Sequence, residues 1–345
     1  MASASTSSMR DDLTARPPAG QAGGRDHATE AWVDLAPPRR RSRAWRERLI
    51  EGALRANGYI AVVLIGLIFL FLFKEGVQAL WHIAPGDFFG TTVTDYRGNP
   101  KVVRLWQPVS EHPKYSLLPL LCGSFLVAVP ATLIAGVFGV ASGIYLAELA
   151  SKRVREVLKP FIELLAGIPT VVLGFLCMAT LGSLLQDMLG TTFRLNAFLG
   201  SLGVSLVIVP VITSLTEDAL RAVPDDLRVA SYGLGATRWQ TIAGVTVPAA
   251  VSGISAALIL GMGRALGETM IVLMATGNAG LITANPFSSV RTMTATIAAE
   301  LGAVDQGGQQ YQALFLVGTL LFSLTFALNV IAEVVIARMR KRLAS

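Results

Sequence analysis

The chain has 345 residues, of which 52% are hydrophobic and only 15% are charged, and its net charge is +6. An average soluble domain carries about 25% charged residues, so this composition argues against a soluble protein and indicates that lipid surrounds much of the chain. The basic residues flank apolar runs, so membrane topology explains the positive charge better than nucleic-acid binding does.

The N-terminal segment, residues 1–56, is predicted to be a disordered, basic cytoplasmic tail. Its first 38 residues are rich in Ala, Ser, Gly and Pro and nearly lack aromatic residues. It is not predicted to be a signal peptide, because the first apolar run begins near residue 56 and is long enough to span a membrane. The arginine cluster at 39–48 is expected to fix the cytoplasmic end of the first span, with binding to anionic lipid as the alternative.

Six apolar segments follow, each near or above the roughly 20 residues that a helix needs to cross a bilayer. They cover residues 56–73, 115–147, 164–186, 195–216, 248–277 and 306–332. Their length favours helices over the segments of about 10 alternating residues of a membrane barrel. We therefore predict an all-α polytopic membrane protein, with a six-helix transmembrane domain at 57–338 and a cytoplasmic tail at 339–345. Gly167 and Pro169 are expected to kink the third span.

The distribution of Lys and Arg predicts the orientation. The segments before the first span, after the second and fourth spans and after the sixth span carry 18 of these residues, and the segments on the opposite side carry seven. The excess places the first set, and with it both termini, in the cytoplasm. The external segment 81–116 is the longest between spans, and its aromatic residues, including Trp106, suit a membrane interface or a contact with an external partner.

Arg264 and Glu268 are the charged residues that interrupt the fifth apolar segment. An arginine at the bilayer centre costs at least about 2.5–3.5 kcal/mol, so its presence there needs a reason. Four residues apart, the two side chains are predicted to share one helix face. The functional interpretation is an anion pathway, in which the planar fork of Arg264 binds a tetrahedral oxyanion. Glu268 would hold the arginine in place or accept a hydrogen bond from a protonated phosphate oxygen, which fully ionised sulfate cannot offer. The structural alternative is a salt bridge that only packs the bundle.

The cytoplasmic stretch 216–250 is predicted to form two short helices, separated by Pro224 and by the pair Gly233 and Gly235. Short helices on the inner face of a membrane protein can dock in a groove of a soluble partner, and the alternative is an ordinary loop. The sequence contains no Gly-Lys dipeptide and hence no phosphate-binding G-x-x-x-x-G-K-[ST] loop. We therefore expect no enzyme activity and no cofactor, and any ATP hydrolysis belongs to another chain.

The same stretch resembles the signature of ABC-importer membrane subunits, which implies a type I ABC importer permease fold. Ala230 and Ser231 stand at the alanine positions, Gly235 at the glycine position, and Pro248 closes the pattern. Val229 departs from the glutamate that the family has there. By this resemblance, the ATPase-coupling residues are Glu217, Asp218, Ala230, Ser231, Gly235 and Pro248.

Four further segments are similar to the phosphate-specific importer, and two of them to its first permease subunit, the PstC type. They are ELLAGIPTVVLGF (163–175), TEDALRAVP (216–224), GRALGETM (263–270) and TATIAAELG (294–302). The resemblance implies a heterodimer with a sister permease, two ATPase subunits and an external phosphate-binding protein, all at the inner membrane. Sulfate or molybdate as substrate, an ATP-independent secondary transporter or channel, and a sensor of phosphate supply stay open.

Overall fold

The computed structural model describes residues 41–94 and 100–343. The chain divides into two units, a first that ends at Gly66 and a second that begins at Leu67. In the first unit the described residues form the N-terminal part of helix α2 (Arg41–His82). Residues 41–56 are therefore helical, which corrects the predicted disorder of that part of the tail, whereas residues 1–40 lie outside the described residues.

The expected number of spans is confirmed, because six helices of the described chain are long and apolar enough to cross a membrane. They cover Glu47–His82, Leu118–Leu149, Thr170–Leu189, Ala197–Arg221, Arg238–Gly267 and Gln309–Val334. The last of them belongs to α13 (Gln309–Leu343), so the helix continues through residues 339–343, where a tail was predicted.

The predicted third and fifth spans are both interrupted. Helix α4 (Lys152–Gly167) ends before Ile168 and Pro169, and α5 (Thr170–Leu176) starts a new helix, so the chain breaks where a kink was expected. Helix α10 (Val247–Gly267) ends before Glu268, and α11 (Met270–Ala275) follows.

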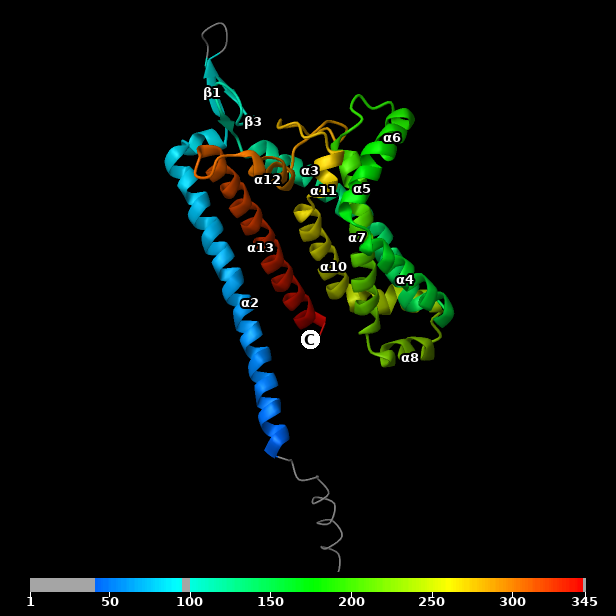
Figure 1. Cartoon of the computed structure of the whole chain (residues 1–345). Helices are drawn as coiled ribbons and strands as arrows, with labels where there is room; N and C mark the ends of the chain where they lie inside the picture. Colours follow the sequence, from blue (N-terminus) through cyan, green and yellow to red (C-terminus); the bar gives the residue numbers. More distant parts are fainter. Residues whose placement is uncertain (1–40, 95–99, 344–345) are drawn as a thin grey trace, which may run out of the picture. The chain divides into compact units, whose positions relative to one another are not determined.

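Small residues hold the second unit together. The most extensive helix contact is that of α3 (Leu118–Ile144) with α7 (Ala197–Arg221), and α10 packs on α7, α3 and α13 (Figure 1). A Cβ added at Gly139 would lie 2.8 Å from Ile212, and one added at Gly143 would lie 2.7 Å from Thr216. Glycine thus lets the two backbones approach closely, as is common between helices in lipid.

Two small β-hairpins lie within the segment 81–116 of this mostly helical chain. β1 (Thr91–Thr94) pairs antiparallel with β2 (Pro100–Val103), and β3 (Trp106–Gln107) pairs with β4 (Lys114–Tyr115). These strands and α12 (Met293–Glu300) lie at one end of the second unit, here called the hairpin end, and α8 (Asp225–Gly233) lies at the other, the α8 end (Figure 1).

The remaining elements are short helical segments: η1 (Pro85–Phe88), η2 (Tyr145–Leu149), η3 (Cys177–Leu181), α6 (Gly182–Leu189), α9 (Arg238–Thr241), η4 (Ile242–Thr246) and η5 (Leu301–Ala303). Of these, η2, η3 and η4 are π-helical and continue neighbouring α-helices. The two helices predicted at 216–250 are present as α8 and α9, with the break at Leu234–Thr237 between them.

Candidate functional site

Arg264 lies in the last turn of α10, and its side chain is exposed in the isolated chain. This position differs from the mid-helix location expected from the sequence, because α10 ends three residues later at Gly267. A cation in the last turn of a helix interacts favourably with the partial negative charge of the unpaired carbonyl groups there. The helix end therefore stabilises the arginine without a neutralising carboxylate.

Glu268 does not share a helix face with Arg264, which corrects the expectation from their spacing. Its backbone is extended (φ −67°, ψ 133°), so it lies outside α10. Within the described part of the chain, no carboxylate lies within 4.0 Å of the Arg264 guanidinium. The Glu268 side chain is half-buried, and its Oε1 lies 3.5 Å from the backbone nitrogen of Ile271 in the first turn of α11.

The break between α10 and α11 is held from a third element. The hydroxyl of Thr294 in α12 donates a hydrogen bond of 2.7 Å to the backbone carbonyl of Glu268. The hydroxyl of Thr269 donates to the carbonyl of Gly267 at 3.3 Å. These two bonds satisfy carbonyl groups that the end of a helix leaves unpaired. Arg264 and Glu268 thus flank a fixed bend.

At the α8 end, a set of large apolar side chains is exposed on α8, α9 and the turn between them. The set consists of Leu227, Val229, Tyr232, Leu234 and Trp239. Leu234 is 90% exposed, and Trp239, at the start of the span Arg238–Gly267, is 65% exposed. Contiguous exposed apolar side chains rimmed by polar residues are typical of a protein-binding surface. We call this set the α8 surface.

Arg228 ties α8 to the end of the second span. Its guanidinium donates to the carboxylate of Glu148 at 2.8 Å, to the carboxylate of Asp225 at 2.9 Å, and to the backbone carbonyls of Leu220 and Val223 at 2.8 Å each. The hydrogen bond to Glu148 is the main cause that raises the pKa of Arg228 above its ordinary value. The α8 surface is therefore attached to the bundle by charge-assisted bonds.

Two further arginines cap the carbonyl end of η2, which completes that span. Arg155 donates to the carbonyls of Leu146 and Ala147 at 2.6–3.1 Å, and Arg238 donates to the carbonyl of Glu148. The prediction missed these residues, although one signal was present. The apolar run 115–147 ends at Glu148, the first charged residue after it. The last backbone carbonyl groups of a helix have no partner within the helix and need hydrogen-bond donors from elsewhere, such as arginine side chains.

Glu217 is fully buried and cannot contact a partner directly, unlike its exposed neighbour Asp218. Its carboxylate lies 2.6 Å from Arg221, 3.2 Å from Lys159 and 3.7 Å from Arg155. These contacts are ionic, since neither oxygen has an aligned hydrogen bond within the described residues. Glu217 thus joins α7 to α4.

The other residues of the resemblance divide between surface and interior. Ala230, Gly235 and Pro248 are exposed, and Gly235 has the left-handed φ of +83° that favours glycine and ends the α8 turn. Ser231 is buried, and its hydroxyl lies 2.9 Å from that of Thr241 in α9. This contact fixes α8 against α9, so Ser231 holds the α8 surface in place without being part of it.

The family model and the relatives that match this chain all describe membrane components of transport systems. Residues 139–341 match the model of the binding-protein-dependent transport system inner membrane component. The chain is 38% identical over 221 residues, 64% of this chain and 72% of the relative, to the probable ABC transporter permease protein YqgH of Bacillus subtilis. It is 30% identical over 319 residues, 87% of this chain and 92% of the relative, to the phosphate transport system permease protein PstC of Mesorhizobium japonicum.

Among solved structures, the chain resembles a subunit of a bacterial ABC transporter involved in the import of the acidic polysaccharide alginate. The TM-score is 0.55 at 16% identity, over 86% of this chain and 99% of that subunit. This likeness concerns the fold alone and agrees with the expected type I ABC importer permease fold. The chain is a multi-pass membrane protein that belongs to the family of binding-protein-dependent transport system inner membrane components.

Proposed function

We propose that this chain is the membrane subunit of an ATP-driven importer of inorganic phosphate, in which it forms half of the translocation pathway. The observation that carries the proposal is similarity to phosphate transport system permease proteins over most of the chain. Such relatives from Mesorhizobium japonicum and Haemophilus influenzae are 30% and 27% identical over 87% of this chain. The segments at 263–270 and 294–302 support the same substrate by resemblance.

The bend at Glu268 supports a role in the pathway. Arg264 is exposed at the end of α10, where its planar fork of donors matches the edge of a tetrahedral oxyanion. Glu268, four residues on and half-buried, supplies an acceptor for the proton of a protonated phosphate, which fully ionised sulfate lacks. In the assembled transporter we place both side chains on the surface that faces the sister subunit across the pathway.

The α8 surface supports coupling to a separate ATPase. Its exposed apolar side chains fit a helix that docks in a groove of a soluble partner. ATP binding in that partner pushes α8, and the bonds from Arg228 to Glu148 and to the end of α7 carry the displacement into the bundle. The exposed residues Asp218, Ala230, Gly235 and Pro248 belong to the contact, while Glu217 and Ser231 act from beneath it.

The proposed assembly contains a sister permease, two ATPase subunits and an external phosphate-binding protein. The α8 end faces the cytoplasm with both termini, as the excess of basic residues on that side favours, and the hairpin end faces outward at the inner membrane. The exposed apolar side chains of α2, such as Leu64 and Leu70, face lipid.

Reconstitution in proteoliposomes tests the function. The full assembly, with the binding protein and labelled phosphate outside and ATP inside, is expected to accumulate phosphate, and excess unlabelled phosphate should suppress uptake while sulfate and molybdate should not. Omission of the ATPase is the control that should abolish uptake. Suppression of uptake by sulfate or molybdate would show that the substrate is another oxyanion. Rapid uptake by this chain alone would show that it is a secondary transporter or channel.

A further inference from the structure

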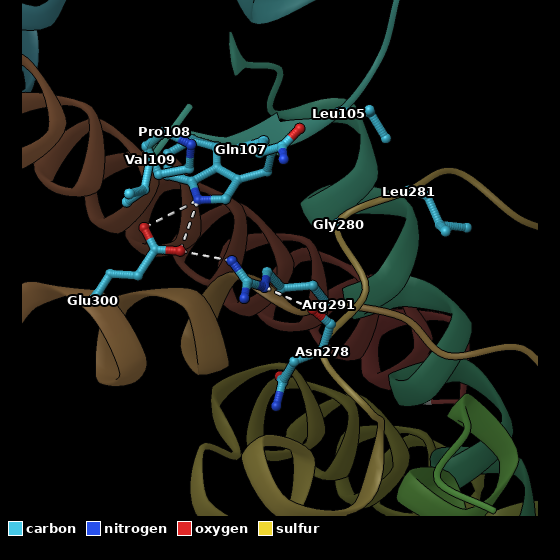
Figure 2. A pocket seen from close by; sticks show the side chains of 10 residues that line it. Leu105, Gln107, Pro108, Val109, Asn278, Gly280, Leu281, Arg291 and Glu300 are labelled. Carbon is cyan, nitrogen blue, oxygen red and sulfur yellow. Dashed lines mark hydrogen bonds and ion pairs between the residues drawn. The ribbon is translucent and has the colours of Figure 1, made fainter. Parts of the chain in front are cut away.

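A cluster of four side chains at the hairpin end lies outside the site described above. The carboxylate of Glu300, at the last residue of α12, accepts a hydrogen bond of 2.6 Å from Arg291 and one of 3.0 Å from Gln310 in α13. The indole nitrogen of Trp106 in β3 lies 3.1 Å from both carboxylate oxygens (Figure 2). Glu300 therefore joins Trp106, 194 residues away in sequence, to the neighbouring residues Arg291 and Gln310, and its side chain is only 14% exposed.

The cluster fixes the β3–β4 hairpin to the loop between α11 and α12. The backbone nitrogen of Trp106 donates to the carbonyl of Gly280 at 3.1 Å, and Arg291 donates to the carbonyl of Asn278 at 3.0 Å. A Cβ added at Gly280 would lie 2.7 Å from the backbone oxygen of Trp106, so the two segments touch without room for a side chain. An open cavity of about 400 Å³ lies beside the cluster, lined by Trp106 and Arg291 (Figure 2).

Helix α12 connects this cluster to the bend in the candidate pathway. It has eight residues, which corresponds to a length of about 12 Å. Its last residue is Glu300, and its second residue, Thr294, donates the 2.7 Å bond to the carbonyl of Glu268. The hydroxyl of Thr292 caps the first turn through the backbone nitrogen of Ala295. A short, capped helix therefore connects Glu300 to Glu268, the residue that follows α10.

We propose that α12 is a lever that couples the β3–β4 hairpin to the bend at Glu268, with Glu300 as its positioning residue. The proposal rests on the proposed function, since the external phosphate-binding protein is the partner that moves the hairpin. Its docking shifts Trp106, the carboxylate of Glu300 follows, and Thr294 moves the peptide of Glu268. Glu300 touches no substrate in this account. It determines how contact at the outer face changes the pathway.

Hydrogen–deuterium exchange of the assembled transporter in lipid nanodiscs tests the lever without any transport. Glu300→Gln keeps an acceptor for Trp106 but removes the charge that pairs with Arg291. It is expected to raise exchange at least fivefold both at the hairpin and at the amides of residues 268–272. Glu111→Gln, an exposed change in the same hairpin, is the matched control and should leave both regions unchanged. Faster exchange confined to the hairpin would overturn the proposal.

Two further variants separate a lever from a local structural role and serve if Glu300→Gln fails to assemble. In Gly280→Ala, the added Cβ displaces the hairpin without a change of charge. This variant should also raise amide exchange at residues 268–272. Thr294→Val removes the hydrogen bond from α12 to the carbonyl of Glu268. It should therefore leave the amides of the hairpin protected from exchange. Both are expected to reduce stimulation of ATP hydrolysis by the binding protein at least fivefold. If the binding protein stimulates ATP hydrolysis normally in both variants, the lever is contradicted. If the unmodified assembly takes up no phosphate, only the proposed function is contradicted.

Discussion

At the scale of single residues, Glu217 is a fully buried charge near the α8 end. Its carboxylate is fully buried and faces three cations, of which Arg155 and Lys159 come from α4 and Arg221 from its own helix. The side chains of the cations are 27–43% exposed, so water shares in their solvation. The carboxylate therefore contributes to stability mainly because it joins α4 to α7. It contributes less by neutralising the cations, since water already solvates them in part.

Replacement of Glu217 by Gln is expected to lower the stability of the purified chain. The neutral amide loses the ion pairs that join α4 to α7, and its own NH2 group is buried beside three cations without an acceptor. The cost is about 1–3 kcal/mol, the range for a buried polar group that loses its partner. Thermal unfolding in detergent measures the change. Asp218→Asn, at the exposed neighbouring position, is the control. A melting temperature equal to that of the control would show that the three ion pairs contribute nothing to stability.

The sequence predicted which residues to examine at the bend but not their geometry. Arg264 and Glu268 stood out because charges are costly in an apolar run, and that argument needs no structure. Their common helix face was inferred from spacing alone and is wrong. Gly267 weakens the helix at that point, and the bond from Thr294, 26 residues away in sequence, fixes the extended backbone of Glu268. A contact of that separation leaves no local trace in the sequence.

At the scale of elements, the packing of α3 against α7 depends on glycine. Gly143→Ala should destabilise the chain by about 1–3 kcal/mol, because its Cβ would lie 2.7 Å from that of Thr216 and 2.9 Å from the backbone oxygen of Thr213. Gly244→Ala is the matched control, since nothing lies within 4 Å of its added Cβ. Thermal unfolding of the two variants compares them directly, and equal stability would show that the helices have room to separate.

The α8 surface carries a prediction about the partner. Leu234→Asp should weaken binding of the ATPase at least tenfold, equivalent to about 1.4 kcal/mol, because it places a charge in an apolar contact. The side chain is 90% exposed, so the fold of the isolated chain should not change. Val109→Asp, at an 85% exposed apolar position of the hairpin end, is the control. Unchanged affinity in a pull-down titration would place the ATPase elsewhere.

At the scale of the whole molecule, the six spans could be predicted because length and hydropathy decide them, and the family could be predicted because short sequence motifs carry the resemblance. Continuous apolar runs identify membrane helices without knowledge of their neighbours. The N-terminal boundary was less accurate, since α2 starts at Arg41 within the described residues, among arginines that are themselves good helix formers. The hairpins and the Glu300 cluster were not predicted, because Trp106 and Glu300 are 194 residues apart in sequence.

The orientation of the chain is testable with two engineered cysteines in a Cys122→Ser background, since Cys177 is buried. A membrane-impermeant maleimide added to intact cells should label Val109→Cys but not Leu234→Cys, which should react only after permeabilisation. Both positions are highly exposed, so access from the medium decides the result. Labelling in the opposite order would invert the proposed topology.

The central claim is that an oxyanion passes the guanidinium of Arg264. The most direct measurement is ATP-dependent uptake of labelled phosphate by the reconstituted assembly that carries Arg264→Gln, with Arg194→Gln as the control for loss of an exposed arginine. We expect uptake to fall to background in the first variant, with the subunits still copurifying and the ATPase still active, and to stay normal in the control. Normal uptake by the Arg264→Gln assembly would contradict this account and leave Arg264 a structural residue at the end of α10.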